Sequence, residues 1–311
     1  MRTPVVLVTG FLGSGKTTLI SRLLERPELG ETAVIVNELG EVGIDHHLLR
    51  RVDERTVLLS SGCVCCVLRG DLSDELRDLL NRRDAGDIPH FRRVVIETTG
   101  VAEPAPIVHT LLTDPLLPYH YSLAAVVATV DGQHGVRGHE AVQQIAAADT
   151  LVVTKADVAE PAAMHVLERE LERLNPTAQT VRAAFGEVDP SLVLTPSGND
   201  VRDLPILDGH VHPDAVHAVT LTLDRAVDWT AFGIWLTMLL HARGTEILRV
   251  KGLLDTGADG PLLVNCVQHA VHPPEHLDEW PDDVRRSRLV LIGRGLDRST
   301  LERSLRAFAG G

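Results

Sequence analysis

The feature that most constrains the fold is a glycine-rich segment close to the start of the chain. An apolar run, Val5–Thr9, has the pattern of a buried strand, and residues 17–25 have the pattern of a helix. Between them, GFLGSGKT at residues 10–17 fits GxxxxGKT. Strand, glycine-rich loop and helix in this order are typical of a phosphate-binding loop, because backbone N–H groups wrap the phosphate and the helix N-terminus attracts its charge.

The pattern that follows this loop predicts an α/β fold. As far as about Gly186, short β-branched runs alternate with longer helical segments. The runs are Ala33–Val36, Val57–Leu59, Val94–Ile96, Ala124–Val130 and Leu151–Val153. Strands that alternate with helices form βαβ units and a mostly parallel sheet that is covered on both faces. We therefore expect a P-loop NTPase domain with a doubly wound, mostly parallel sheet.

A second, smaller α+β domain is expected after a linker. The periodicity fades in a stretch rich in Pro, Gly, Asp and Asn, which is typical of a connection between domains. After it come a strand at Ala218–Leu223, an amphipathic helix at Trp229–His241, a hairpin of Ile247–Leu254 and Leu262–Cys266, a strand at Arg288–Ile292 and a helix at Leu296–Phe308. We place the P-loop domain at residues 1–190, the linker at 191–214 and the second domain at 215–311.

The charge balance excludes several kinds of partner. The chain has 30 Lys and Arg against 43 Asp and Glu, a formal net charge of -13, which has the wrong sign for binding nucleic acid or an anionic membrane. No apolar run approaches the roughly 18 to 20 residues that span a bilayer, and the N-terminus shows no signal-peptide pattern. We expect a cytoplasmic protein that binds neither nucleic acid nor membrane.

Two motifs supply the phosphate and Mg²⁺ ligands that a phosphate loop requires. Lys16 is expected to bridge the β- and γ-phosphates, and the Thr17 hydroxyl to bind Mg²⁺. The strand that ends in ETTG adds a carboxylate, Glu97, that would hold Mg²⁺ through water, and an N–H at Gly100 that would sense the γ-phosphate. These four are the predicted catalytic residues, and the predicted phosphate contacts are Gly10, Gly13, Ser14, Gly15, Lys16 and Thr17.

A third motif indicates which base is bound. LVVTKAD at residues 151–157 places Thr154, Lys155 and Asp157 at the end of another buried strand. The Asp157 carboxylate can accept hydrogen bonds from N1 and N2 of guanine, which adenine does not offer, while the Lys155 stem packs on the purine. The motif therefore favours GTP over ATP. Thr154 replaces the Asn of the common NKxD, and its shorter side chain raises the question of a looser base contact.

Three of the four cysteines lie in one loop between the phosphate loop and the Glu97 strand. Cys63, Cys65 and Cys66 occur in SSGCVCC, a spacing too tight for a disulfide framework. Three thiolates form a soft donor set for Zn²⁺, Co²⁺ or Cu⁺. Glu38 or Glu41, in NELGEVGID, could add an oxygen ligand or bind the water shell of Mg²⁺. Core packing and a metal-free redox role of the vicinal thiols are the alternatives.

On these residues the chain resembles the CobW-like family of P-loop metal-chaperone GTPases, relatives of the nickel-delivery GTPases of hydrogenase and urease maturation. The resemblance rests on GFLGSGKTT, NELGEVGID, SSGCVCC, ETTG and TKAD in this order, and it continues through ILRVKG and RRSRLVLIGR over nearly the whole chain. It implies that the cysteines bind a cargo metal when GTP and Mg²⁺ are bound. Hydrolysis would then release the metal to a client protein, which the CobW-type C-terminal domain helps to recognise.

The resemblance also assigns roles to individual residues. It gives Gly13, Gly15, Lys16, Thr17 and Thr18 to the phosphates and Mg²⁺, Glu97 to Mg²⁺ and water, Thr154, Lys155 and Asp157 to guanine, and Cys63, Cys65 and Cys66 to the cargo metal. To these metal ligands we add Glu38, from its place after the second predicted strand. The Irving–Williams order makes a Cys-rich site prefer Cu and Zn over Co or Ni at equal availability, so metal supply also decides selectivity. We expect Zn²⁺ as the cargo, with Co²⁺ next. Many relatives carry a long His-rich tract, whereas this chain has only His210, His212 and His217 near the domain junction.

Two other classes of function stay open at this point. A small-molecule kinase would use the same phosphate loop, and phosphate transfer to an added acceptor would reveal it. A redox-regulated GTPase switch would use the vicinal thiols without metal, and reversible disulfide formation that changes GTP hydrolysis would reveal it. The client protein is unidentified, and the sequence leaves open whether the protein forms a homodimer.

Overall fold

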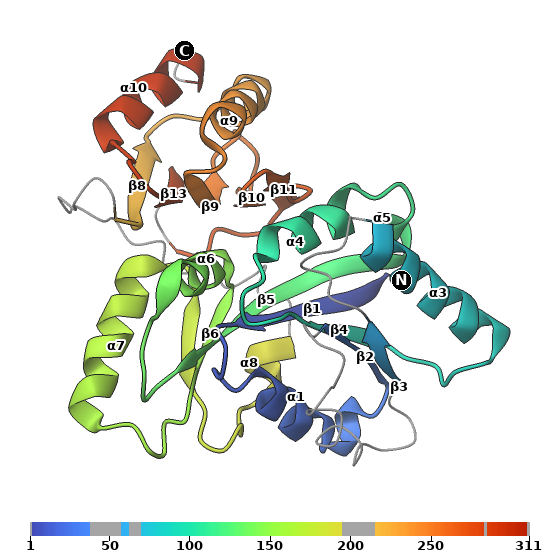
Figure 1. Ribbon diagram of the computed structural model, residues 1–311. Helices are drawn as coiled ribbons and strands as arrows, with labels where there is room; N and C mark the ends of the chain where they lie inside the picture. Colours follow the sequence, from blue (N-terminus) through green and yellow to red (C-terminus); the bar gives the residue numbers. More distant parts are fainter. Residues whose placement is uncertain (1, 38–56, 62–69, 195–214, 283–284, 310–311) are drawn as a thin grey trace. The chain divides into compact units, whose positions relative to one another are not determined.

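The computed structural model describes residues 2–37, 57–61, 70–194, 215–282 and 285–309 (Figure 1). The chain divides into two compact units, Met1–Arg169 with Ala178–Ser197 and Glu170–Thr177 with Gly198–Gly311. The predicted domain boundaries stay a prediction, because most of the expected linker lies outside the described residues. Among the described residues, no helix is both long enough and apolar enough to cross a bilayer.

The first unit is built on a sheet of seven strands that all pair in parallel. The strands are β1 (Thr3–Gly10), β2 (Thr32–Asn37), β3 (Val57–Ser61), β4 (Arg93–Glu97), β5 (Tyr121–Asp131), β6 (Thr150–Thr154) and β7 (Gln179–Arg182), in the spatial order β3-β2-β4-β1-β5-β6-β7. The six predicted strands are confirmed. The seventh, β7, was not predicted, because most of its side chains are exposed and it lacks an apolar run.

Helices cover both faces of this sheet, as the doubly wound prediction requires (Figure 1). They are α1 (Lys16–Leu24), η1 (Pro27–Leu29), α3 (Gly70–Ala85), α4 (Pro104–Thr113), α5 (Leu117–His120), α6 (Gly138–Ala147), α7 (Pro161–Leu174) and α8 (Pro190–Leu194). Leu19 and Leu23 of α1 pack with Val193 of α8 in one core cluster on the sheet, and α4 and α6 lie on the opposite face. Strands buried on both faces explain the continuous Val and Ile runs.

The strand order gathers the polar motifs at one edge of the sheet. β1 lies between β4 and β5, so the chain leaves β1 at the point where the strand order reverses, which is where open α/β sheets bind ligands. The phosphate loop follows β1, ETTG ends β4 and TKAD follows β6. Because all these strands are parallel, their carboxyl ends share this edge.

The second unit is a separate α+β structure with an antiparallel sheet. Its strands are β8 (His217–Leu223), β9 (Ile247–Leu254), β10 (Leu262–Val267), β11 (Ala270–Val271), β12 (Glu275–His276) and β13 (Ser287–Gly293), and its helices are α9 (Trp229–Arg243) and α10 (Arg298–Ala309). The main path runs β11-β10-β9-β13-β8, and β12 pairs with β10. The predicted strands and helices are confirmed.

One prediction about the second unit was wrong. Helix α9 buries Phe232, Trp235 and Leu236 in the core, and the Trp235 indole Nε1 donates to Ser304 Oγ of α10 at 3.0 Å. The opposite side of α9 mixes polar and apolar residues, since Ile234 and Met238 are 51% and 55% exposed beside the exposed Thr237 and His241. The helix therefore lacks the polar face that an amphipathic helix presents.

Candidate functional site

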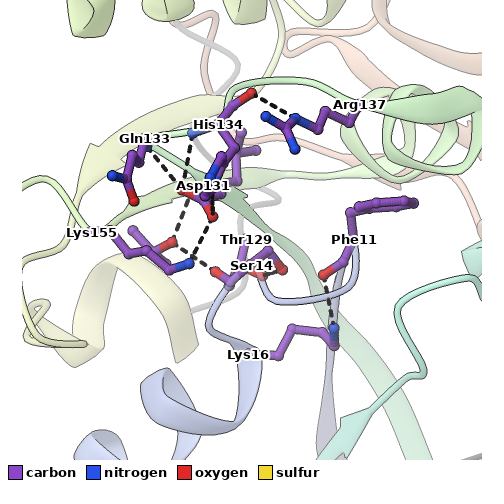
Figure 2. A network of polar contacts seen from close by, with 11 residues as sticks. Phe11, Ser14, Lys16, Thr129, Asp131, Gln133, His134, Arg137 and Lys155 are labelled. Carbon is purple, nitrogen blue, oxygen red and sulfur yellow. Dashed lines mark hydrogen bonds and ion pairs between the residues drawn. The ribbon is translucent and has the colours of Figure 1, made fainter. Parts of the chain in front are cut away.

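Lys16 begins α1 and its side chain folds back over the phosphate loop. Its Nζ donates to Gly10 O at 2.9 Å and to Phe11 O at 3.2 Å, and the residue is only 8% exposed. Figure 2 shows the ammonium group directed at the Phe11 carbonyl. The loop therefore holds a buried cation at the N-terminus of a helix, and this N-terminus has no acidic residue in its first turn and no side-chain cap. Both properties favour an anionic ligand.

The phosphate loop is fixed to strand β5 by a close backbone approach. A Cβ at Gly10 would lie 2.2 Å from Thr129 Oγ1, and Gly10 has φ +142°, so only glycine fits this position. Thr129 Oγ1 lies 2.6 Å from Ser14 Oγ and donates to Thr9 O at 3.3 Å. Two hydroxyls and one glycine thus hold both ends of the loop against the same strand.

Thr17 and Glu97 meet as predicted for a Mg²⁺ site. The Thr17 hydroxyl donates to Glu97 Oε1 at 2.6 Å, and Glu97 is 4% exposed at the end of β4. A hydroxyl and a carboxylate oxygen are hard donors of the type that Mg²⁺ takes beside nucleotide phosphates. The donor set fits that ion, and the assignment of both residues to Mg²⁺ stays a prediction.

The ETTG segment lies directly against the phosphate loop. The Thr98 N–H donates to Val8 O at 3.0 Å, which extends the pairing of β4 with β1 past the end of the strand. A Cβ at Gly100 would lie 2.5 Å from Leu12 N, so the two backbones touch. The predicted γ-phosphate contact of Gly100 stays a prediction, but the glycine lies beside the loop that would bind the phosphates.

The Thr154 side chain, which is shorter than the Asn of the common NKxD motif, contacts two backbone carbonyls. Its hydroxyl lies 2.7 Å from Ser14 O and 3.1 Å from Val130 O, and it donates to these carbonyls. The threonine therefore braces the phosphate loop, and its assignment to guanine stays a prediction. Asp157, the predicted guanine ligand, is exposed three residues further on, where its carboxylate is accessible to a base.

Asp131 is a site residue that sequence reasoning missed. Its Oδ1 accepts the N–H groups of Gln133 and His134 at 2.9 and 3.2 Å, and its Oδ2 lies 2.7 Å from Lys155 Nζ and 2.8 Å from His134 Nδ1 (Figure 2). Burial acts to raise the pKa of Asp131, but the hydrogen bonds from Lys155, His134 and Gln133 outweigh it and lower the pKa to about 2. The ion pair fixes the end of the Lys155 side chain.

A tight turn after β7 completes the base side of the site, and it also escaped sequence reasoning. Phe185 has φ +53° and is 69% exposed, and the turn is closed by a bridge between Ala184 and Glu187. The Ala156 N–H of TKAD donates to Ala183 O at 3.2 Å. An exposed aromatic followed by glycine, after the strand that was not predicted, was the available signal. Phe185 is therefore an exposed aromatic residue two positions after a direct backbone contact with the TKAD loop.

The predicted cargo-metal ligands Cys63, Cys65, Cys66 and Glu38 lie outside the described residues, as does Glu41. Within the described parts of the chain, no group of three or more His, Cys, Asp or Glu side chains is arranged to hold a metal ion. The remaining cysteine, Cys266, is buried in β10, where burial raises the pKa of its thiol to about 12. A neutral thiol is a poor metal ligand.

Of the three histidines near the domain junction, only His217 is described. It is buried at the start of β8, with Nδ1 3.0 Å from Ala215 O and Nε2 3.1 Å from Leu296 O. Both ring nitrogens thus face backbone carbonyls of the second unit. This arrangement is structural and does not suit a metal-storage role.

Comparison with known proteins gives matches over both units. Residues 4–182 match the family described as "CobW/HypB/UreG, nucleotide-binding domain", and residues 216–309 match "Cobalamin synthesis protein cobW C-terminal domain". The zinc chaperone YjiA of Escherichia coli is 34% identical, over 98% of this chain and 98% of its own. The zinc chaperone CobW of Pseudomonas aeruginosa is 30% identical, over 97% of this chain and 90% of its own.

A solved structure agrees with the fold of the whole chain. The crystal structure of Zn(II)-bound YjiA GTPase from E. coli matches with a TM-score of 0.77 and 29% identity, over 99% of both chains. The two matched families follow each other in the order that the sequence motifs predicted. The chain therefore belongs to the CobW/HypB/UreG family, as a member in which a CobW C-terminal domain follows the nucleotide-binding domain.

Proposed function

We propose that the protein is a GTP-hydrolysing metallochaperone that binds Zn²⁺ through Cys63, Cys65 and Cys66 in its GTP state and delivers it to a client protein. The observation that carries the proposal is the convergence of Lys16, the Thr17–Glu97 pair and the TKAD loop on one edge of the sheet. The names of the relatives support the cargo, since YjiA and CobW are both called zinc chaperones.

Different described residues would contact the phosphates, the base and Mg²⁺. Lys16 and the uncapped start of α1 would bind the phosphates, and Asp157 would accept the guanine N1 and N2 hydrogens while Phe185 and the Lys155 stem flank the base. Thr17 and, through water, Glu97 would hold Mg²⁺, which neutralises charge on the phosphates during hydrolysis. Gly100 would donate its N–H to the γ-phosphate. The protein's own contribution to hydrolysis is then positioning and fixed charge.

The register of the sheet supports coupling between nucleotide and metal. Ser60 of β3 pairs with Val36 of β2, and Val36 pairs with Glu97 of β4. Ser60 therefore lies level with Glu97 at two strand spacings, about 10 Å. The cysteine motif begins directly after β3, and Glu38 directly after β2. Both segments thus start from the edge of the sheet that would change when the γ-phosphate is lost.

A transfer cycle follows from linkage. If GTP favours the arrangement in which the three thiolates converge, the metal must tighten GTP binding by the same factor. Hydrolysis removes the γ-phosphate, and metal affinity falls by the coupling free energy, typically about 1 to 3 kcal/mol. Because that amount alone does not release a tightly held Zn²⁺, a ligand from the client would complete the exchange. Co²⁺ is the second cargo to consider.

An anaerobic metal competition titration tests the proposal. Zn²⁺ and Co²⁺ would be titrated against a chromophoric chelator with Mg-GTP analogue, with Mg-GDP and without nucleotide. We expect the wild type to bind Zn²⁺ at least about fivefold more tightly with the GTP analogue, and Cys65→Ser to lose this difference. The matched control is Cys266→Ser, which changes a buried neutral thiol and should keep the nucleotide dependence.

The opposite results would each exclude a part of the proposal. Zn²⁺ affinity that ignores the nucleotide would exclude the chaperone cycle. If a reversible disulfide in the metal-free protein switched GTP hydrolysis on and off, the result would favour the redox switch instead. Transfer of the γ-phosphate to an added small molecule, rather than to water, would favour the kinase.

A further inference from the structure

Helix α6 holds the ETTG segment through one buried side chain. Gln144 is 1% exposed, and its Nε2 donates to Gly100 O at 3.1 Å and to Ala102 O at 3.0 Å. These two carbonyls lie on either side of Val101, and the Ala102 N–H closes a turn on Thr99 O at 3.1 Å. Neither bond is part of the sheet or of a helix. A single carboxamide therefore ties the turn that contains Gly100 to a neighbouring element.

The position of this turn matters because it touches the phosphate loop. A side chain at Gly100 would collide with the backbone of Leu12, so the Gly100 backbone lies close enough to the loop to share a ligand with it. Gln144 also lines a pocket of ≈ 90 Å³ with Phe11, Leu12 and Ile145. The pocket therefore lies next to both the Gln144 side chain and the phosphate loop.

We propose that Gln144 is a positioning residue that holds Gly100 beside the phosphate loop before the nucleotide binds. The inference rests on the proposed function, in which Gly100 contacts the γ-phosphate. GTP reaches a turn that is already ordered, whereas GDP has no γ-phosphate and gains nothing from the turn. Gln144 therefore raises the affinity for GTP relative to GDP, and through linkage it raises the effect of GTP on metal binding.

Substitution of Gln144 by methionine separates this role from general packing. Methionine has a similar length and volume but no donor, so the core stays filled while both hydrogen bonds are lost. We expect the affinity for a GTP analogue to fall about tenfold, the loss expected for about two hydrogen bonds to buried carbonyls. The affinity for GDP should change less than twofold. The matched control is Gln143→Met, a buried glutamine on the same helix, which should leave the GTP to GDP ratio as in the wild type.

Substitution of Gln144 by glutamate makes the ratio of GTP to GDP affinity depend on pH, which a purely structural role of the side chain would not do. An ionised carboxylate cannot donate to Gly100 O, but a protonated one supplies one donor. Burial beside two carbonyls raises the pKa of such a carboxyl group. The GTP to GDP ratio of Gln144→Glu should therefore recover in part as the pH falls from about 8 to about 5.5, while the ratio of Gln144→Met stays low at every pH.

The outcomes separate this inference from the proposed function. If the wild type binds a GTP analogue no better than GDP, the proposed γ-phosphate contact fails and the inference fails with it. If the wild type prefers the analogue and Gln144→Met keeps that preference, the inference alone is overturned. If Gln144→Met lost affinity for the GTP analogue and for GDP equally, the inference would also be overturned, because the side chain would then only support the fold.

Discussion

The two sides of the phosphate loop are built differently. On the base side, Thr154 donates directly to the loop at Ser14 O, and Lys155 is fixed by an ion pair with Asp131. On the γ-phosphate side, the Gly100 backbone touches the loop, but the described residues show no hydrogen bond between Gly100 and the loop. Instead, Gln144 of α6 donates to the Gly100 carbonyl. The base side is therefore part of the loop's own bonding network. On the phosphate side Glu97 is bonded to the loop through Thr17, whereas the turn that contains Gly100 is held by a separate element.

This difference suits a protein that must keep its nucleotide but respond to hydrolysis. GTP and GDP carry the same base, so the contacts on the base side need not change during the cycle. The γ-phosphate contact must form and break, and a turn held by two hydrogen bonds can move at a modest free-energy cost. We expect substitutions on the base side to weaken both nucleotides alike, and substitutions on the phosphate side to change their ratio.

The largest expected effect is at Lys16, whose predicted partners include the β-phosphate that GTP and GDP share. In Lys16→Ala the loop loses the cation that faces its carbonyls, so the phosphates lose a charge-assisted partner. Affinity for the GTP analogue and for GDP should each fall more than about 100-fold, as measured by calorimetry. Unfolding of the free protein should stay cooperative, because the Lys16 hydrogen bonds to Gly10 O and Phe11 O lie at the edge of the sheet and outside its core. Retained micromolar affinity for either nucleotide would show that the helix N-terminus suffices.

The second prediction concerns base recognition by Asp157. Asp157→Asn replaces an acceptor pair with one acceptor and one donor, which mismatches the guanine N2 amino group but suits the O2 of xanthine. Affinity for GTP and GDP should fall together by about 50-fold, and XTP should bind more tightly than GTP. A competition assay with a fluorescent nucleotide measures both. If the ratio of GTP to GDP affinity changed as well, the division between the two sides would be wrong.

Sequence reasoning found the chemical groups of the site but not the contacts that arrange them. The pattern GxxxxGKT, the carboxylate at Glu97 and the TKAD motif are local, and the apolar runs before them predicted six parallel strands correctly. Asp131 and Gln144 act on residues 24 and 44 positions away, so their roles depend on the strand order, which no local pattern contains. An acidic residue after an apolar strand and a glutamine in a helix are otherwise common.

Two further differences have similar physical reasons. Strand β7 pairs with β6 at the edge of the sheet and exposes most of its side chains, so it carries no apolar run. Helix α9 was predicted to be amphipathic, but Ile234 and Met238 are exposed opposite its buried face. Apolar residues on the surface are normal in folded proteins, and a sequence pattern does not distinguish them from core residues.

The third prediction tests the brace at Thr154. Thr154→Val keeps the shape of the side chain but leaves Ser14 O without its hydroxyl donor, which should lower the free energy of unfolding by about 1 to 2 kcal/mol. Affinity for GTP analogue and GDP should fall equally, by about fivefold. The matched control is Thr154→Ser, which keeps the hydroxyl. A loss confined to the GTP analogue would show that the brace acts on the γ-phosphate side after all.

The smallest expected effect concerns Asp131 and acid. The pKa of Asp131 is lowered to about 2 because hydrogen bonds from Lys155, His134 and Gln133 to its carboxylate outweigh its burial. A carboxyl group with a lowered folded-state pKa stabilises the fold above its unfolded pKa, near 4, and this contribution is lost as the pH falls toward 2. In Asp131→Asn the amide does not titrate, so its part of the acid destabilisation should disappear.

Thermal unfolding at several pH values measures this effect. The wild type should have a higher Tm than Asp131→Asn at pH 7, and the difference should shrink steadily between about pH 4 and pH 2, because other carboxylates titrate alike in both proteins. Asp157→Asn, which changes an exposed carboxylate at the same edge of the sheet, is the matched control. A Tm difference that stays constant over this range would mean that the ion pair with Lys155 does not contribute to stability. Lys155 would then be positioned by its backbone alone, and the rigid base side would depend on Thr154.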